Sequence, residues 1–185
     1  MAIFVFYLMQ SGMNGQLHLY TGNGKGKTTA ALGLLIRAYG AGQRVLFAQF
    51  VKGIEYSEIK TLKLLNDRVD YRVYGRGCFI HKDPEEADIR KARKHFSELR
   101  QLLTNDCPYD MVILDELNIA AYFNLIPIKD ILDMIDECQP HVELVITGRY
   151  APPELIERAD LVTEMLEVKH YFTDKGLQAR EGIEY

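Results

Sequence analysis

The chain has 185 residues, 48% of them hydrophobic, so it is long enough to bury one sizeable core and short for two. Its formal net charge of −4 and the absence of any long basic run argue against nucleic acid as a partner. Three widely spaced cysteines and five histidines without ligand spacing argue against a disulfide framework or a zinc site, and they indicate a cytoplasmic protein with reduced thiols.

The chain begins with an apolar arm, which we delimit as residues 1–14. Residues 2–9 are almost entirely apolar, but they lack a basic leader and fall far short of the ~20 residues that a membrane-spanning helix needs. Their β-branched and aromatic content favours a strand, added to the domain or packed on a partner subunit. We expect no membrane anchor, and a single domain over residues 15–185.

The strongest motif follows this arm. Residues 17–20 are typical of a strand, the next residues form a loop with three glycines, and the chain from Lys27 to about residue 41 has helical apolar density. Such a loop turns its amides toward an anion at a helix N-terminus, with Lys27 at the outer phosphates and the Thr28 hydroxyl at Mg²⁺. The alternative is a lysine-rich turn that caps a buried helix. The predicted polyphosphate contacts are Gly22, Asn23, Gly24, Lys25, Gly26, Lys27, Thr28 and Thr29.

The loop departs from the common consensus G-x-x-x-x-G-K-[ST], because Thr21 stands where the first glycine is usual. Residues 44–50 then form a short buried strand, which completes a βαβ unit. Lys52 follows this strand and either assists the phosphates or lies in solvent beside a turn glycine.

The middle of the chain contains an amphipathic helix over residues 57–65 and a strand over residues 69–74. The glycine-hinged loop over residues 75–81 is either a lid over a hydrophobic ligand or a buried corner. A long helix begins near Asp83 as its N-cap and runs to about residue 104, with an inward stripe. The stripe consists of Ala87, Ala92, Phe96, Leu99 and Leu103.

The second chemical landmark is the stretch over residues 109–116, an apolar strand that delivers Asp115 and Glu116 to the carboxyl edge of the sheet. In phosphate-loop proteins this strand usually lies next to the first, so we expect one carboxylate near Mg²⁺ and the other able to polarise a water. The alternative is a strand that ends in two solvated acids.

The remaining elements are helices over residues 117–125, 128–137 and 152–159, strands over residues 143–147 and 161–168, and a tail with few core residues. Arg149 follows the first of these strands and either reaches a phosphate or pairs with Glu154. About six strands alternate with helices. The sequence therefore predicts a single three-layer α/β domain of the P-loop NTPase-like (RecA-like) class, with a mainly parallel sheet.

These residues alone lead to Mg²⁺-nucleotide binding and leave the reaction open. An ATPase, a small-molecule kinase and an enzyme that reacts at the ribose carbon with triphosphate as leaving group all need the same grip on the phosphates. A nucleotide sensor without turnover is a further alternative.

Residues 21–31 resemble the loop of the P-loop type ATP:corrinoid (cob(I)alamin) adenosyltransferases, including the missing first glycine. Similar blocks follow in the same order, so the resemblance covers about residues 15–185. These blocks are residues 49–53, 112–117, 145–149, 159–164, 168–170 and 182–185.

The resemblance implies transfer of the 5′-deoxyadenosyl group of ATP to the cobalt of a reduced corrinoid, with release of triphosphate, in adenosylcobalamin synthesis or salvage. Lys27 and Glu116 would be catalytic, and Thr28, Glu116 and Asp115 would lie at Mg²⁺. ATP would also contact Lys52 and Arg149. The resemblance further implies a homodimer and a reducing flavoprotein as electron donor.

The family binds the cob(II) form without its lower axial ligand, behind apolar residues at the lower face of the corrin. The corresponding loop here includes Cys78, Phe79 and Ile80. Familiar members have a Phe and a Trp spaced by one residue in this loop, whereas this chain has no tryptophan.

Overall fold

A computed structural model describes residues 14–51, 56–75 and 84–185 of the chain. The apolar arm, Lys52 and the loop residues Cys78, Phe79 and Ile80 lie outside the described residues, so the predictions that concern them are not tested by the fold.

Six strands form one sheet in which every pairing is parallel, in the order β3-β2-β4-β5-β1-β6. Every residue of β2 and β4 is buried, as expected for central strands that are covered on both faces. The predicted strand content and parallel arrangement are confirmed. The strands are β1 (Leu17–Thr21), β2 (Val45–Gln49), β3 (Val69–Val73), β4 (Met111–Asp115), β5 (Glu143–Thr147) and β6 (Leu161–Glu164).

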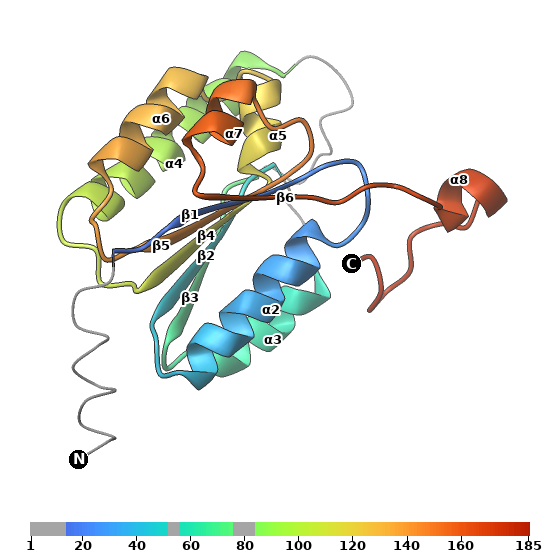
Figure 1. The fold of residues 1–185 in the computed structure, drawn as a ribbon, viewed down its shortest axis with the longest axis horizontal. Helices are drawn as coiled ribbons and strands as arrows, with labels where there is room; N and C mark the ends of the chain where they lie inside the picture. Colours follow the sequence, from blue (N-terminus) through green and yellow to red (C-terminus); the bar gives the residue numbers. More distant parts are fainter. Residues whose placement is uncertain (1–13, 52–55, 76–83) are drawn as a thin grey trace.

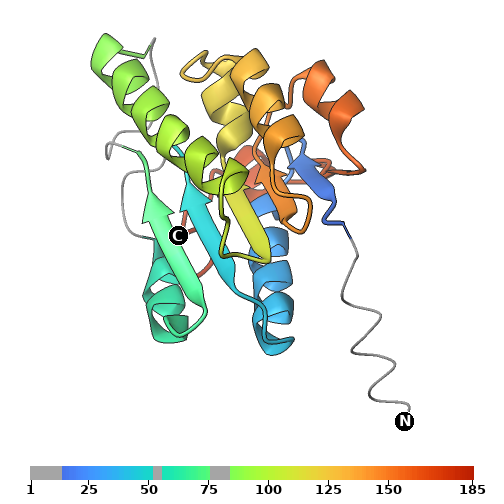
Figure 2. The same cartoon turned by 90° about the vertical axis from the view of Figure 1, so that its left-hand side faces the viewer.

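Helices cover both faces of the sheet, which gives the three predicted layers (Figures 1 and 2). One face carries α2 (Lys27–Gly40), α3 (Ser57–Leu62) and the 3₁₀ turn η1 (Lys63–Leu65). The other face carries α4 (Glu86–Thr104), α5 (Leu117–Tyr122), α6 (Ile128–Glu137) and α7 (Pro153–Arg158). The short helix α8 (Tyr171–Lys175) projects from the body, and the chain then returns toward the start of α2 (Figure 1).

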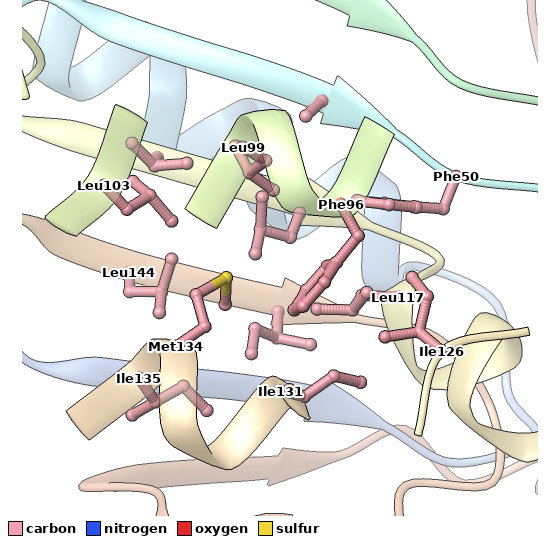
Figure 3. Close-up of a cluster of buried hydrophobic side chains, with 14 of the residues drawn as sticks. Phe50, Phe96, Leu99, Leu103, Leu117, Ile126, Ile131, Met134, Ile135 and Leu144 are labelled. Atoms are coloured by element: carbon pink, nitrogen blue, oxygen red, sulfur yellow. The ribbon is translucent and has the colours of Figure 1, made fainter. Parts of the chain in front are cut away.

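Two apolar clusters hold these layers together, one on each face of the sheet. In the larger cluster, Phe96 and Leu99 of α4 lie close to Ile131 and Met134 of α6 above the sheet (Figure 3). The predicted inward stripe of α4 is therefore correct, except that Ala87 is only half-buried. Among the described residues, every helix is too short or too polar to cross a lipid bilayer.

The prediction that the strand ending in Asp115 lies next to the first strand is wrong. β4, which ends in Asp115, pairs with β2 and β5, and β5 separates it from β1. The acidic strand still meets the glycine loop, because α2 packs across β4 and β5 and Thr28 in its first turn bonds to Asp115 at the end of β4.

Several element boundaries also differ from the expectation, among them the end of α5, which is Tyr122 and not residue 125. Helix α4 begins at Glu86, where Glu85 and Asp88 form a reciprocal capping box, so the N-cap is Glu85 and not Asp83. The last strand ends at Glu164, and the backbone of Met165 bonds to the glycine loop instead.

The larger cluster generates a stability prediction. Leu99 is fully buried, and Leu99→Ala should lower the free energy of unfolding by about 2–5 kcal/mol, since the lost burial and the cavity add. Leu64→Ala is the matched control, because Leu64 is 80% exposed and should change the free energy by less than about 0.5 kcal/mol. Urea unfolding of both variants measures the difference. Equal losses would contradict the assignment of Leu99 to the core.

Candidate active site

Backbone strain gathers at the carboxyl edge of the sheet. Val51, Glu116 and Tyr150 have φ angles of 64°, 63° and 57°, and they follow the ends of β2, β4 and β5 respectively. A left-handed conformation of a residue other than glycine costs about 1–3 kcal/mol and tends to occur at functional sites. Ligands bind at this edge in open α/β sheets, so the strain marks the same region as the sequence motifs.

The glycine loop after β1 requires glycine where it turns. Gly22 has a φ of 93°, and a Cβ added there would lie 2.5 Å from the carbonyl oxygen of Met165. Gly26 has a φ of 121° and forms the N-cap of α2. The sequence prediction of a strand, a loop and a helix at this point is confirmed.

The N-terminus of α2 presents amide groups to the loop. The first helical bond is donated by the amide of Ala30 to the carbonyl of Gly26, at 2.8 Å. The amides of Lys27, Thr28 and Thr29 therefore precede the helical ladder. In the described part of the chain no side chain caps this end, and its first turn contains no acidic residue. The positive end of the helix dipole thus faces the loop, as an anion site requires.

Lys27 is held inside the loop. Its ammonium donates hydrogen bonds to the carbonyl oxygens of Gly22, at 2.7 Å, and Gly24, at 2.8 Å. The residue is only 8% exposed, so its charge stays beside the loop and does not extend into solvent.

Asp115 is the centre of a buried hydrogen-bond network. Its carboxylate accepts hydrogen bonds from the Thr28 hydroxyl at 2.8 Å, the Thr147 hydroxyl at 2.7 Å and the Gln49 side-chain amide at 3.0 Å. These donors come from α2, β5 and β2, and Asp115 itself is fully buried. The network therefore ties the helix of the glycine loop to three neighbouring strands.

Glu116 follows Asp115 in the left-handed conformation and precedes α5. Its amide donates a hydrogen bond to the Thr147 hydroxyl at 3.1 Å. Unlike Asp115 it is partly exposed, so the turn places one carboxylate in the network and the next one nearer the surface. The alternative reading, a strand that ends in two solvated acids, is wrong for Asp115.

The oxygen atoms of this region suit Mg²⁺, which prefers hydroxyl, carboxylate and phosphate oxygens. Because the Thr28 hydroxyl donates its proton to Asp115, its lone pairs remain available to a cation. No group of three or more His, Cys, Asp or Glu side chains within the described ranges could hold a metal by itself. A Mg²⁺ ion at Thr28 would take its remaining ligands from water or from phosphate oxygens.

Lys25, another predicted polyphosphate contact, is bonded to the C-terminal tail. Its ammonium donates to the Glu184 carboxylate at 2.7 Å, the Ile183 carbonyl at 2.9 Å and the Tyr171 hydroxyl at 3.1 Å. Sequence reasoning missed this contact. Residues 182–185 belonged to a block of the resemblance, but nothing in the pattern indicated that they reach the loop.

The segment after β6 also holds the loop. The Gly24 amide donates to the Met165 carbonyl at 2.7 Å, and the Met165 amide donates to the Thr21 carbonyl at 2.9 Å. The loop and this segment run side by side beyond the end of the sheet (Figure 1). One of the three loop glycines thus turns its amide toward the neighbouring strand segment and not toward an anion.

Arg149 lies on the turn that follows β5 and is exposed. One contact joins this turn to α5, and another joins it to Thr21, where β1 runs into the glycine loop. The Asn118 side-chain amide donates to the Gly148 carbonyl at 2.9 Å, and the Ala151 amide donates to the Thr21 hydroxyl at 3.3 Å. The ion pair with Glu154 that the sequence allowed does not form among the described residues. The phosphate role of Arg149 stays a prediction.

The sequence of the chain matches a protein family and several known proteins. A model of the family described as "ATP:corrinoid adenosyltransferase BtuR/CobO/CobP" matches residues 13–185. A corrinoid adenosyltransferase of Pseudomonas aeruginosa is 38% identical over 172 residues, which cover 92% of this chain and 84% of that protein. The corrinoid adenosyltransferase of Escherichia coli K12 is 36% identical over 172 residues, with 92% and 86% covered. The corrinoid adenosyltransferase CobA of Salmonella typhimurium is 34% identical over 171 residues, with 92% and 86% covered.

The close packing of the loop generates a prediction about nucleotide affinity. A Cβ on Gly24 would lie 2.7 Å from the backbone oxygens of Met165 and Leu166, which cannot rotate away. Gly24→Ala should therefore displace the loop at a cost of about 1–3 kcal/mol. The ATP affinity measured by calorimetry should therefore fall by about tenfold to a hundredfold.

Gly33→Ala is the matched control, since a Cβ there meets nothing within 4 Å on an exposed part of α2. This variant should keep the ATP affinity and raise the free energy of unfolding by about 0.5–1 kcal/mol. Unchanged ATP affinity in Gly24→Ala would show that the loop tolerates displacement.

Proposed function

Because the chain belongs to the ATP:corrinoid adenosyltransferase family, we propose that its glycine loop, residues 22–28, grips the triphosphate of ATP while the ribose carbon reacts. The activity of the protein is the ATP-dependent adenosylation of corrinoids, in which the 5′-deoxyadenosyl group passes to the cobalt of a reduced corrinoid. The hydrogen bond between Thr28 and Asp115 carries the proposal, because it joins the loop helix to the acidic strand.

The proposed reaction needs no covalent bond between the protein and its substrates. A cobalt–carbon bond forms at C5′ of the ribose, the C5′–oxygen bond breaks, and triphosphate leaves with that electron pair. The reduced cobalt of the substrate is itself the nucleophile. The protein therefore has two tasks, which are to align C5′ between cobalt and the leaving oxygen and to stabilise the charge on the departing triphosphate. The loop amides and the Lys27 ammonium suit the second task.

The proposed Mg²⁺ ligands of the protein are Thr28 and Glu116, with Asp115 holding the Thr28 hydroxyl by its hydrogen bond. When bound, the ion neutralises charge on the triphosphate oxygens. Asn23, Thr29, Lys52 and Arg149 complete the proposed ATP contacts. The proposal for the corrinoid is that Cys78, Phe79 and Ile80 cover its lower face.

The proposal also includes a homodimer in the cytoplasm and a reducing flavoprotein that supplies the electron for cob(I). The homodimer and the flavoprotein follow from the resemblance to the family, and the cytoplasmic location follows from the three widely spaced cysteines.

Incubation with MgATP and chemically reduced cobalamin tests the function. The expected products are a light-sensitive adenosylated corrinoid and one triphosphate for each corrinoid consumed. ADP formed without corrinoid would support the ATPase or kinase alternative, which the family assignment does not favour. Binding of ATP without any product would support a nucleotide sensor.

Lys27 generates the kinetic prediction. Lys27→Ala should lower kcat for adenosylation by about 10²–10³-fold, the loss usually seen when one preorganised donor at a developing charge is removed. Lys129→Ala is the control, because Lys129 lies on α6 and its side chain is 80% exposed in a surface ion pair with Asp133. Rates are measured with pre-formed cob(I) at saturating ATP, and circular dichroism confirms that both variants fold. Near-normal turnover of Lys27→Ala would refute the role.

A further inference from the structure

The C-terminal tail, residues 171–185, is attached to the phosphate-binding loop through one lysine. An ammonium group has three donors, and those of Lys25 have three partners in this tail, namely Tyr171, Ile183 and Glu184. Lys25 stands between two glycines of the loop, so a contact made by its side chain constrains the most flexible part of that loop.

Glu184 is the hub of the attachment. Besides the Lys25 ammonium, its carboxylate accepts hydrogen bonds from the Tyr171 hydroxyl and from the backbone amide of Arg180, the latter at 2.8 Å. The Arg180 guanidinium lies 3.3 Å from the same carboxylate and 5.1 Å from the centre of the Tyr171 ring. The tail is thereby folded around this carboxylate.

Lys25 and Glu184 carry the opposite charges that an ion pair requires. Hydrogen bonds from Lys25, Tyr171 and Arg180 hold the pKa of Glu184 well below its usual range. Burial acts to lower the pKa of Lys25, but the bonds with Glu184 and Tyr171 outweigh it and raise that pKa. Both groups are therefore ionised near neutral pH. Glu184 is only 19% exposed, which distinguishes this pair from most surface ion pairs of the chain.

The far end of the tail contacts the domain at a second place. The Tyr185 ring lies 6.4 Å from the Tyr56 ring, next to the start of α3, and Glu181 pairs with Lys60 of that helix at 3.6 Å. Both side chains of the latter pair are largely exposed, at 74% and 63%. The tail therefore bridges the loop and α3. Of the two ion pairs that join it to the domain in the described part of the chain, the one at Lys25 is the less exposed.

We propose that Glu184 is a positioning residue for the phosphate-binding loop and acts through Lys25, and that Lys25 is an anchor for this tail and not a direct ligand of the triphosphate. The anchor holds a glycine-rich loop in one shape before ATP arrives, so less conformational freedom is lost on binding. The inference rests on the proposed function only in that the loop binds ATP.

A double-mutant cycle tests the proposal, with Lys25→Met, Glu184→Gln and the double variant. The dissociation constant for ATP is measured by calorimetry on the full-length protein in the absence of corrinoid. Each single substitution should weaken ATP binding by about fivefold or more, and the double variant should be no weaker than the poorer single variant, because both break the same contact. Lys25→Arg, which keeps the charge, should recover most of the affinity.

The matched control is Glu181→Gln, which removes the same charge from the same tail at an exposed pair and should change ATP affinity by less than about twofold. Steady-state assays add a second readout. The KM for ATP should rise in Glu184→Gln while kcat at saturating ATP stays close to normal, since loop ordering acts on binding.

A large loss in Lys25→Met with normal affinity in Glu184→Gln would overturn the proposal and make Lys25 a phosphate ligand. Losses that multiply in the double variant would overturn it in the same way. Normal ATP affinity in all variants would show that the tail does not act on the loop. If affinities follow the prediction but no adenosylated corrinoid forms in the unaltered protein, the inference stands and the proposed function fails.

Discussion

One buried carboxylate, Asp115, joins the helix that follows the glycine loop to the central strands of the sheet. Asp115 has no exposed surface, and a charge in that position is tolerated only when hydrogen bonds replace its water. Three neutral donors provide them, from α2, β5 and β2. Removing any one donor leaves the carboxylate less satisfied, so the three elements are held in a single mutual arrangement.

The strand order explains why this carboxylate sits where it does. The acidic strand is not the neighbour of the first strand, and β5 lies between them. The inserted strand supplies Thr147. Its hydroxyl donates a hydrogen bond to Asp115 and accepts one from the Glu116 amide. The gap between the glycine loop and the acids is thus filled by a polar side chain that belongs to the network. The left-handed backbone at Glu116 is the local cost of turning the chain there.

Much of this could be predicted from the sequence, because the informative patterns are local. The glycines and lysines of residues 22–27 and the apolar strand that ends in Asp115 each reveal their structure within a few residues. The pairing of strands depends on contacts across the whole chain, and a usual arrangement suggested the wrong neighbour for β4. Lys25 shows the same limit, since its position favours a phosphate role and its actual partner, Glu184, is 159 residues away. The N-cap of α4 was misplaced because Asp is favoured over Glu at an N-cap, and only the reciprocal bonds between Glu85 and Asp88 identify Glu85.

The residues that brace the glycine loop come from late in the chain, and this has a consequence for the order of biosynthesis. A ribosome makes the loop early, but the backbone of Met165 and the side chain of Glu184 that brace it follow about 140 and 159 residues later. A nascent chain that has completed β1 and α2 therefore holds a loop without its braces. The loop can reach its native contacts only after translation has passed these residues, so translation products that end before Met165 lack both braces.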